Sequence, residues 1–163
     1  MYNRSLKHPI TALIIAILAC GFALVMNTQM KLGERVQAVE DGFFTSVAGE
    51  RSIYSRLEEK LDAANGLWTV LEGVDANAAQ SLSDARSGLL TAYESRDISA
   101  MYDANSELDK VYADAVNVLN GAELGESMQN ALDSYTTNYE GAQKIIEQNC
   151  YNSSVLEFMR STF

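Results

Sequence analysis

The chain contains 163 residues, with 22 acidic against 12 basic side chains, and its formal net charge is −10. Proteins that bind nucleic acid need a basic surface to meet the phosphates, so nucleic acid is excluded as a partner. The single histidine is His8, in the N-terminal tail. A Ser-His-Asp triad or a metal site of His and Cys therefore cannot form in the rest of the chain. We expect no enzymatic activity, no cofactor and no metal.

An uncharged, apolar segment runs from Ile10 to Met26, after an N-terminal tail of residues 1–9. As a helix it would be about 25 Å long, near the short end of what crosses a bilayer. We predict that residues 10–26 form an uncleaved transmembrane anchor, so that the chain is a single-pass protein of the cell membrane.

Two other interpretations of this segment stay open. A cleaved signal peptide has a shorter apolar core and an exit site of small residues, whereas apolar residues here continue from Phe22 to Met26. A lipoprotein would be cleaved before Cys20, but the sequence GFALVM that follows is unusually apolar for one. Close to the segment, two basic residues lie on each side: Arg4 and Lys7 before it, and Lys31 and Arg35 after it. The orientation is therefore open, and the amino terminus slightly favours a domain outside the cytoplasm.

The rest of the chain, residues 27–163, has its apolar residues three and four positions apart, which is the helical period. Pro9 is the only proline, so no later helix is interrupted by one. Asp75 is placed to cap a helix. The expected helices run from the anchor to about residue 45 and over 53–73, 76–93, 98–120 and 127–160. We predict an all-α fold, with the anchor followed by one acidic domain that is an antiparallel bundle of about four helices.

Two features of these helices are candidates for a function. Asn105 falls at an inward position of a heptad, where it would contact a ligand or fix the helix register; a slightly rotated helix would instead leave it at the rim. Tyrosine is enriched in the three C-terminal helices. We expect these rings to pack in the core, with an aromatic-lined pocket as the alternative. The tyrosines are Tyr93, Tyr102, Tyr112, Tyr135, Tyr139 and Tyr151.

The last predicted helix carries a motif. The sequence YEGAQKII at residues 139–146 leads to Tyr151, Asn152, Val155 and Phe158. This pattern resembles the closing helix of the bacterial LemA family, in which a Glu-containing helix precedes Tyr-Asn-x-x-Val and an aromatic residue. The order of tail, membrane span and helical domain is similar too. The resemblance implies a membrane-anchored helical bundle with no established enzymatic activity or cofactor, and it gives the four motif residues no known role.

These features predict a membrane-anchored, non-enzymatic bundle that binds a partner protein or organises the cell envelope. The anchor provides the membrane contact, and the identity of the partner stays open. The alternative is a membrane-tethered sensory bundle that binds a small ligand among its tyrosines.

Overall fold

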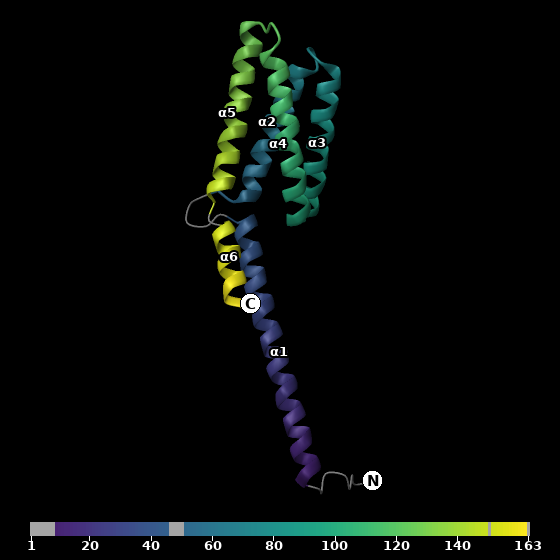
Figure 1. Cartoon of the computed structure of the whole chain (residues 1–163), viewed down its shortest axis with the longest axis vertical. Helices are drawn as coiled ribbons and strands as arrows, with labels where there is room; N and C mark the ends of the chain where they lie inside the picture. Colours follow the sequence, from purple (N-terminus) through teal and green to yellow (C-terminus); the bar gives the residue numbers. More distant parts are fainter. Residues whose placement is uncertain (1–8, 46–50, 150, 163) are drawn as a thin grey trace. The chain divides into compact units, whose positions relative to one another are not determined.

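The computed structural model describes residues 9–45, 51–149 and 151–162, and their regular structure is entirely helical (Figure 1). No strand occurs in these three ranges, so the predicted all-α fold class is confirmed. The helices are α1 (Pro9–Phe44), α2 (Ile53–Leu71), α3 (Ala76–Ser95), α4 (Ile98–Asn120), α5 (Glu126–Gln148) and α6 (Tyr151–Thr162).

The chain divides into two compact units. The bundle unit is Gly42–Asn152 and contains α2 to α5. The hairpin unit consists of the described residues of Met1–Asp41 and Ser153–Phe163, that is, most of α1 and of α6.

Short connections join the four long helices of the bundle unit, so that successive helices run in opposite directions (Figure 1). Helix α2 packs against both α3 and α5, and α3 packs against α4. Side-chain caps explain where two of the helices begin. Asp75 accepts hydrogen bonds from the backbone N–H groups of Asn77 and Ala78 at the start of α3, as predicted, and Asp97 accepts one from Ala100 at the start of α4.

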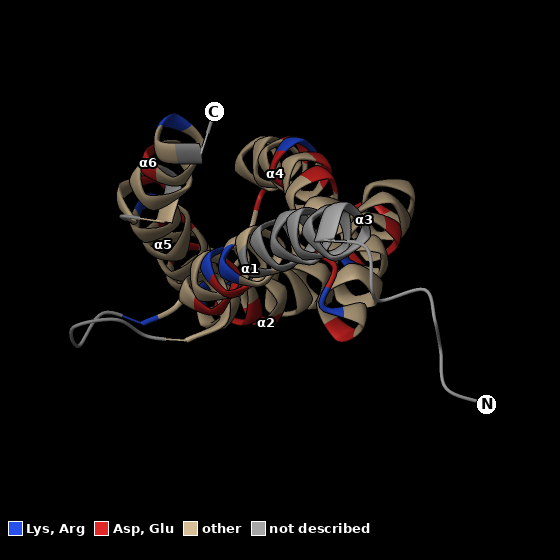
Figure 2. Ribbon diagram, turned by 90° about the horizontal axis from the view of Figure 1, so that it is seen from below, with Lys and Arg blue, Asp and Glu red and all other residues tan. Residues whose placement is uncertain are grey.

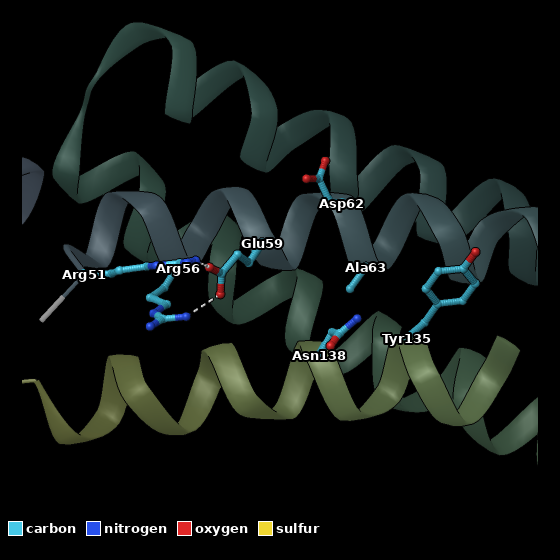
Figure 3. A pocket seen from close by; sticks show the side chains of 7 residues that line it. All are labelled: Arg51, Arg56, Glu59, Asp62, Ala63, Tyr135 and Asn138. Atoms are coloured by element: carbon cyan, nitrogen blue, oxygen red, sulfur yellow. Dashed lines mark hydrogen bonds and ion pairs between the residues drawn. The ribbon is translucent and has the colours of Figure 1, made fainter. Parts of the chain in front are cut away.

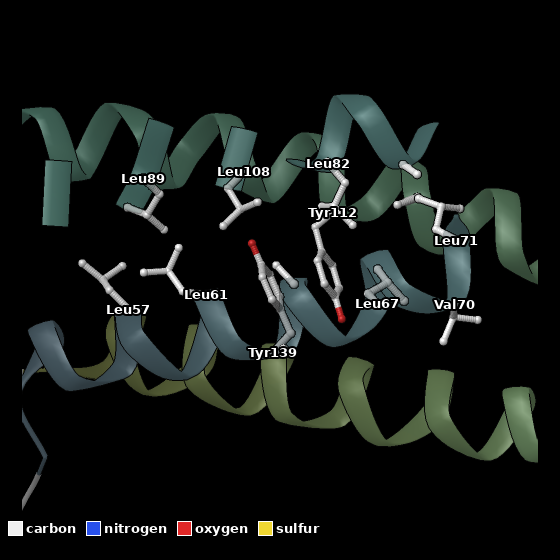
Figure 4. Close-up of a cluster of buried hydrophobic side chains, with 14 of the residues drawn as sticks. Leu57, Leu61, Leu67, Val70, Leu71, Leu82, Leu89, Leu108, Tyr112 and Tyr139 are labelled. Carbon is white, nitrogen blue, oxygen red and sulfur yellow. The ribbon is translucent and has the colours of Figure 1, made fainter. Parts of the chain in front are cut away.

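Leucines from the first three bundle helices and two tyrosines form the centre of the core (Figure 4). The rings of Tyr112 on α4 and Tyr139 on α5 stack with their centroids 3.6 Å apart and their planes 7° from parallel. Both side chains are 4% exposed, in agreement with the predicted core role of the tyrosines. Tyr102 differs, because it is 76% exposed.

Helices α2 and α5 approach closely at Gly66. A Cβ atom at this position would lie 2.2 Å from Cε1 of the Tyr135 ring, well inside van der Waals contact. The absence of a side chain on α2 therefore makes room for an aromatic ring of α5.

The prediction of one helix over residues 127–160 is wrong. Helix α5 ends at Gln148, and Asn149 is extended with ψ at 139°. The Asn149 side chain accepts a hydrogen bond from the backbone N–H of Tyr151, where α6 begins. Asparagine competes in this way with the helical hydrogen bonds of its own backbone, which is the physical reason for the break.

Within the hairpin unit, α6 lies beside α1 (Figure 1). The Arg35 guanidinium donates a hydrogen bond to Ser161 Oγ at 2.5 Å and lies 5.5 Å from the ring centroid of Phe158. Several apolar side chains of this unit stay in solvent. They are Met26, Met30, Val36, Leu156 and Met159.

In the part of the chain that the structure describes, no helix offers a stretch long and apolar enough to cross a membrane. The predicted anchor, residues 10–26, belongs to α1, but its side chains up to residue 25 lie outside the described residues. Residues 1–8 of the predicted tail lie outside them too.

Candidate functional site

Lys60 is the only charged residue buried in the described part of the bundle unit, and its side chain is fully inaccessible to solvent. It projects from α2 toward α4 and α5. Its ammonium donates hydrogen bonds to Asn105 Oδ1 at 2.5 Å, Asp109 Oδ1 at 2.5 Å and Gln143 Oε1 at 2.6 Å. A lysine has three N–H donors, so each donor has a protein acceptor.

The acceptors of Lys60 are themselves held by further hydrogen bonds. The hydroxyl of Tyr139 donates to Asp109 Oδ1 at 2.8 Å, and the Asn105 amide donates to Asp109 Oδ2 at 3.2 Å. The Lys60 ammonium also lies 4.6 Å from the centroid of the Tyr139 ring. One buried cation thus connects three helices through a polar network that also orients the stacked tyrosines.

Burial and neighbouring charges shift the pKa values of two residues in this network. Burial lowers the pKa of Lys60 below its ordinary value, and the hydrogen bond and charge of Asp109 partly oppose the shift, as does the charge of Glu147. Burial also raises the pKa of Tyr139, and the neighbouring Asp109 carboxylate raises it further. The network is therefore most stable with the tyrosine protonated.

A cleft of about 300 Å³ lies next to this network, at the end of the bundle unit where α2 and α4 begin and α5 ends. Most of its lining is apolar or aromatic, and its polar lining consists of Tyr102, Asn105, Gln143 and Glu147. The amides of Asn105 and Gln143 therefore separate the cleft from the Lys60 ammonium. Its apolar lining is Phe43, Ile53, Leu57, Ile98, Met101, Ile146 and Tyr151.

A second, more open groove of about 590 Å³ lies between α2 and α5 (Figure 3). Arg51 and Arg56 both donate to the carboxylate of Glu59, the latter at 2.5 Å. Asp62 and Asn138 line the groove further along. Two cationic and two anionic side chains balance each other there, so the groove favours no ligand of one charge.

Among the residues predicted from sequence, Asn105 and Tyr151 both line the cleft. Asn105 is half-buried and accepts a hydrogen bond from Lys60, so it lies in a polar network rather than in a purely apolar core. The ring of Tyr151 packs edge-on against the buried Phe43, with 5.3 Å between centroids.

Two other motif residues belong to the hairpin unit. Val155 and Phe158 are half-buried in the hairpin unit, where Phe158 lies under Arg35. The side chain of Asn152 lies outside the described residues. The described motif side chains thus belong to two different units.

Lys60, Asp109 and Gln143 were not predicted from sequence as a site. A signal was present, because Lys60 follows Leu57 by three positions and precedes Ala64 by four, which places it on the apolar stripe of α2. No group of His, Cys, Asp and Glu side chains in the described ranges is arranged to hold a metal ion.

Comparisons with family models, with curated proteins and with solved structures gave no match to this chain. The physical chemistry of its own residues therefore supplies the basis for a function.

Proposed function

We propose that the chain is a membrane-tethered helical bundle of LemA type that acts by binding rather than by catalysis, and that it presents its acidic bundle to a partner protein at the cell envelope. The observation that carries this proposal is the continuity of α1. The helix includes the apolar segment from Ile10 to Met26 and continues without a break to Phe44. Its penultimate residue, Phe43, is buried in the core of the bundle unit.

The surface of the chain supports a role in protein interaction. The bundle unit contains eighteen acidic and seven basic residues, and acidic side chains occur on each of its long helices (Figure 2). The hairpin unit adds exposed apolar side chains, among them Met30 at 63% and Leu156 at 55%. The exposed apolar side chains of the hairpin unit suit a partner with an apolar stripe, and the acidic bundle unit suits a partner with basic residues.

Membrane tethering is tested by carbonate extraction of membranes from cells that express the full chain. We expect the wild type to stay in the pellet. Leu18→Arg, near the centre of the segment, should move a large share to the supernatant, because an arginine there costs about 3 kcal/mol of insertion free energy. Leu18→Ile is the matched control and should stay in the pellet. Extraction of the wild type by carbonate would overturn the tether.

The side on which the bundle lies is tested with one added cysteine. Val74→Cys is suitable because Val74 is 39% exposed in the turn after α2. Cys20 and Cys150 are first replaced by Ala and Ser. Labelling of intact cells by an impermeant maleimide places the bundle outside the cytoplasm, and labelling only after lysis places it inside.

Partner binding is tested by photo-crosslinking in membranes. A photoreactive residue at Leu156, in the exposed apolar surface, should give a discrete crosslinked band. The same probe at Asp84, an exposed position on α3, reports contact through the acidic bundle unit. If neither position gives a discrete band, the interaction role is contradicted.

A second function is favoured by the cleft beside Lys60, namely the binding of a small ligand. Its volume and mainly apolar lining are typical of small ligand sites, and a few polar groups converge on it. A thermal-shift screen of the full chain in nonionic detergent tests this function. At a ligand concentration of 100 times the Kd, we expect a stabilisation of about 2.7 kcal/mol.

A further inference from the structure

We propose that the cleft of the bundle unit binds a small organic cation with an apolar body. This inference rests on the second function proposed above and names the chemical class of its ligand.

The size and lining of the cleft favour a ligand with an apolar body. The cleft holds about 300 Å³, which is the lower end of the range of small-molecule sites. Phe43 and Leu57 are buried at its wall, and Met101 is fully buried beside them. An apolar group that enters the cleft would therefore replace water next to side chains that already belong to the core.

The charges around the cleft favour a ligand that carries a positive charge. The polar cluster contains one cation, Lys60, and two carboxylates, Asp109 and Glu147. Asp109 is paired with Lys60, whereas Glu147 forms no ion pair with any described basic residue. Glu147 lines the cleft and Asp109 does not, so the excess negative charge lies on the side that a ligand would reach.

The geometry around Glu147 leaves this carboxylate available. Its Oε1 atom accepts a hydrogen bond from Gln143 Nε2 at 2.9 Å, and the residue is exposed. The Gln143 amide is in turn fixed by Lys60. The buried network thus holds the amide that orients the carboxylate at the rim.

Two aromatic rings of the lining add to the preference for a cation. Tyr102 is 76% exposed at the rim, and Tyr151 is half-buried against Phe43. An organic ammonium group between a carboxylate and a tyrosine ring gains both a charge pair and a cation–π contact. An anion of the same size would meet only repulsion from Glu147, and the acidic bundle unit would add to it.

Calorimetric titration of the full chain in nonionic detergent tests the inference with three probes of one shape. They are 3-phenylpropylammonium, 3-phenylpropanol and 3-phenylpropanoate. We expect the ammonium to bind about tenfold more tightly than the alcohol, which is the size expected for one partly exposed charge pair and one cation–π contact. The propanoate should bind most weakly.

Three variants locate the binding. Glu147→Gln should remove most of the preference for the ammonium over the alcohol, since only the cation–π contact remains, and should leave the affinity for the alcohol unchanged. Glu123→Gln makes the same chemical change at an exposed position of the α4–α5 connection, at the opposite end of the bundle unit, and should have no effect. Ile146→Trp, which fills the cleft, should abolish binding of all three probes, and Ile98→Trp repeats the test from the opposite wall.

Each outcome decides a different point. Equal affinity for ammonium and alcohol would overturn the cation inference while leaving the ligand-binding function in place. No binding of any probe would overturn both. Equal effects of Glu147→Gln and Glu123→Gln would show that only the overall acidity attracts the cation, and would also overturn the assignment to the cleft. Glu147 is exposed, so its substitution tests the inference even if the tryptophan variants fail to fold.

Discussion

At the scale of single side chains, the environment of Lys60 decides how a substitution there will act. Lys60→Met keeps the length of the side chain but removes the charge. Asp109 then loses its ion pair, and the oxygens of Asn105 and Gln143 lose a donor at half-buried positions. We expect the free energy of unfolding to fall by about 2–3 kcal/mol, because polar groups that lose a charged partner away from bulk water are costly. Urea unfolding of the full chain in detergent measures this.

The control for this prediction is Lys110→Met, which breaks an exposed ion pair with Glu107 at 3.2 Å. Its cost should stay below about 0.5 kcal/mol. The double variant Lys60→Met/Asp109→Leu should recover part of the lost free energy of unfolding, since it removes the carboxylate that has lost its ion pair. Equal losses for Lys60→Met and Lys110→Met would contradict the role of the buried network.

Tyr112 gives the bundle a dependence on alkaline pH. Burial raises its pKa from 10.0 to about 12; the neighbouring Thr136 hydroxyl partly opposes this shift, and the charge of Glu140 adds a smaller increase. Between pH 10 and 12 the unfolded chain has lost this proton and the folded chain still holds it, so stability falls as the pH rises through this window. The contribution of Tyr112 is complete below pH 10. We expect the loss across the window to be about 2 kcal/mol.

Tyr112→Phe should remove this part of the pH dependence, which urea unfolding at a series of pH values measures. The Tyr112 hydroxyl is buried without a hydrogen-bond partner among the described residues, so the variant should be close to wild type in stability at neutral pH. Tyr102→Phe, at an exposed position, should keep the wild-type slope. The lowered pKa of Lys60 acts in the opposite direction up to 10.5, but it is common to all three proteins. A wild-type slope in Tyr112→Phe would contradict the prediction.

The sequence allowed part of this network to be predicted. Asn105 was identified from its inward heptad position, because a polar residue there interrupts a regular apolar pattern. Lys60 was not identified, since a lysine beside an apolar stripe usually extends its ammonium to solvent. Its burial requires acceptors that lie 45, 49 and 83 residues further along the chain. Only the packing of α4 and α5 against α2 brings these acceptors together.

At the scale of the helices, Gly66 controls the distance between α2 and α5. Gly66→Ala would place a Cβ atom against the Tyr135 ring. The gain in helix propensity, about 1 kcal/mol, is smaller than the cost of the clash, so we expect a net loss of about 2 kcal/mol in the free energy of unfolding. Chemical denaturation measures this loss.

Gly88→Ala is the matched control on α3, because nothing lies within 4 Å of a Cβ atom built there. It should stabilise the protein by about 0.5–1 kcal/mol through helix propensity alone. The opposite signs of these two glycine substitutions are the test. Stabilisation by both would show that the Tyr135 ring moves aside freely.

The helix boundaries followed from sequence where a cap marks them, as Asp75 does for α3. The break at Asn149 was missed, because its only local signal is one asparagine in a polar stretch. The end of α5 is set by the hydrogen bond from Tyr151 to the Asn149 side chain, and apolar spacing contains no information about such a bond.

At the scale of the whole molecule, the net charge of −10 opposes compaction. Among the described acidic side chains, Glu59, Glu107 and Asp109 form ion pairs, and acidic residues outnumber basic ones by 22 to 12 in the chain. Salt should therefore screen more repulsion than attraction. We expect the Tm of the full chain to rise by about 3 °C between roughly 20 and 500 mM sodium chloride.

Differential scanning calorimetry in nonionic detergent measures this shift. Sodium sulfate also strengthens apolar burial, so sodium chloride is the appropriate salt. A Tm that falls with added chloride would mean that attractive pairs outweigh the repulsion among the acidic side chains.

The three acceptors of Lys60 have a consequence for the order in which the bundle assembles. An intermediate in which α2 has packed against α3 alone leaves the ammonium in water, and docking of α4 without α5 would bury it with one acceptor missing. Partly assembled states are therefore unfavourable. The last helix to dock supplies the remaining hydrogen-bond acceptor for the Lys60 ammonium. We expect a cooperative transition without a populated intermediate, in which Lys60 contributes only after the rate-limiting step, so that Lys60→Met speeds unfolding and leaves the refolding rate nearly unchanged.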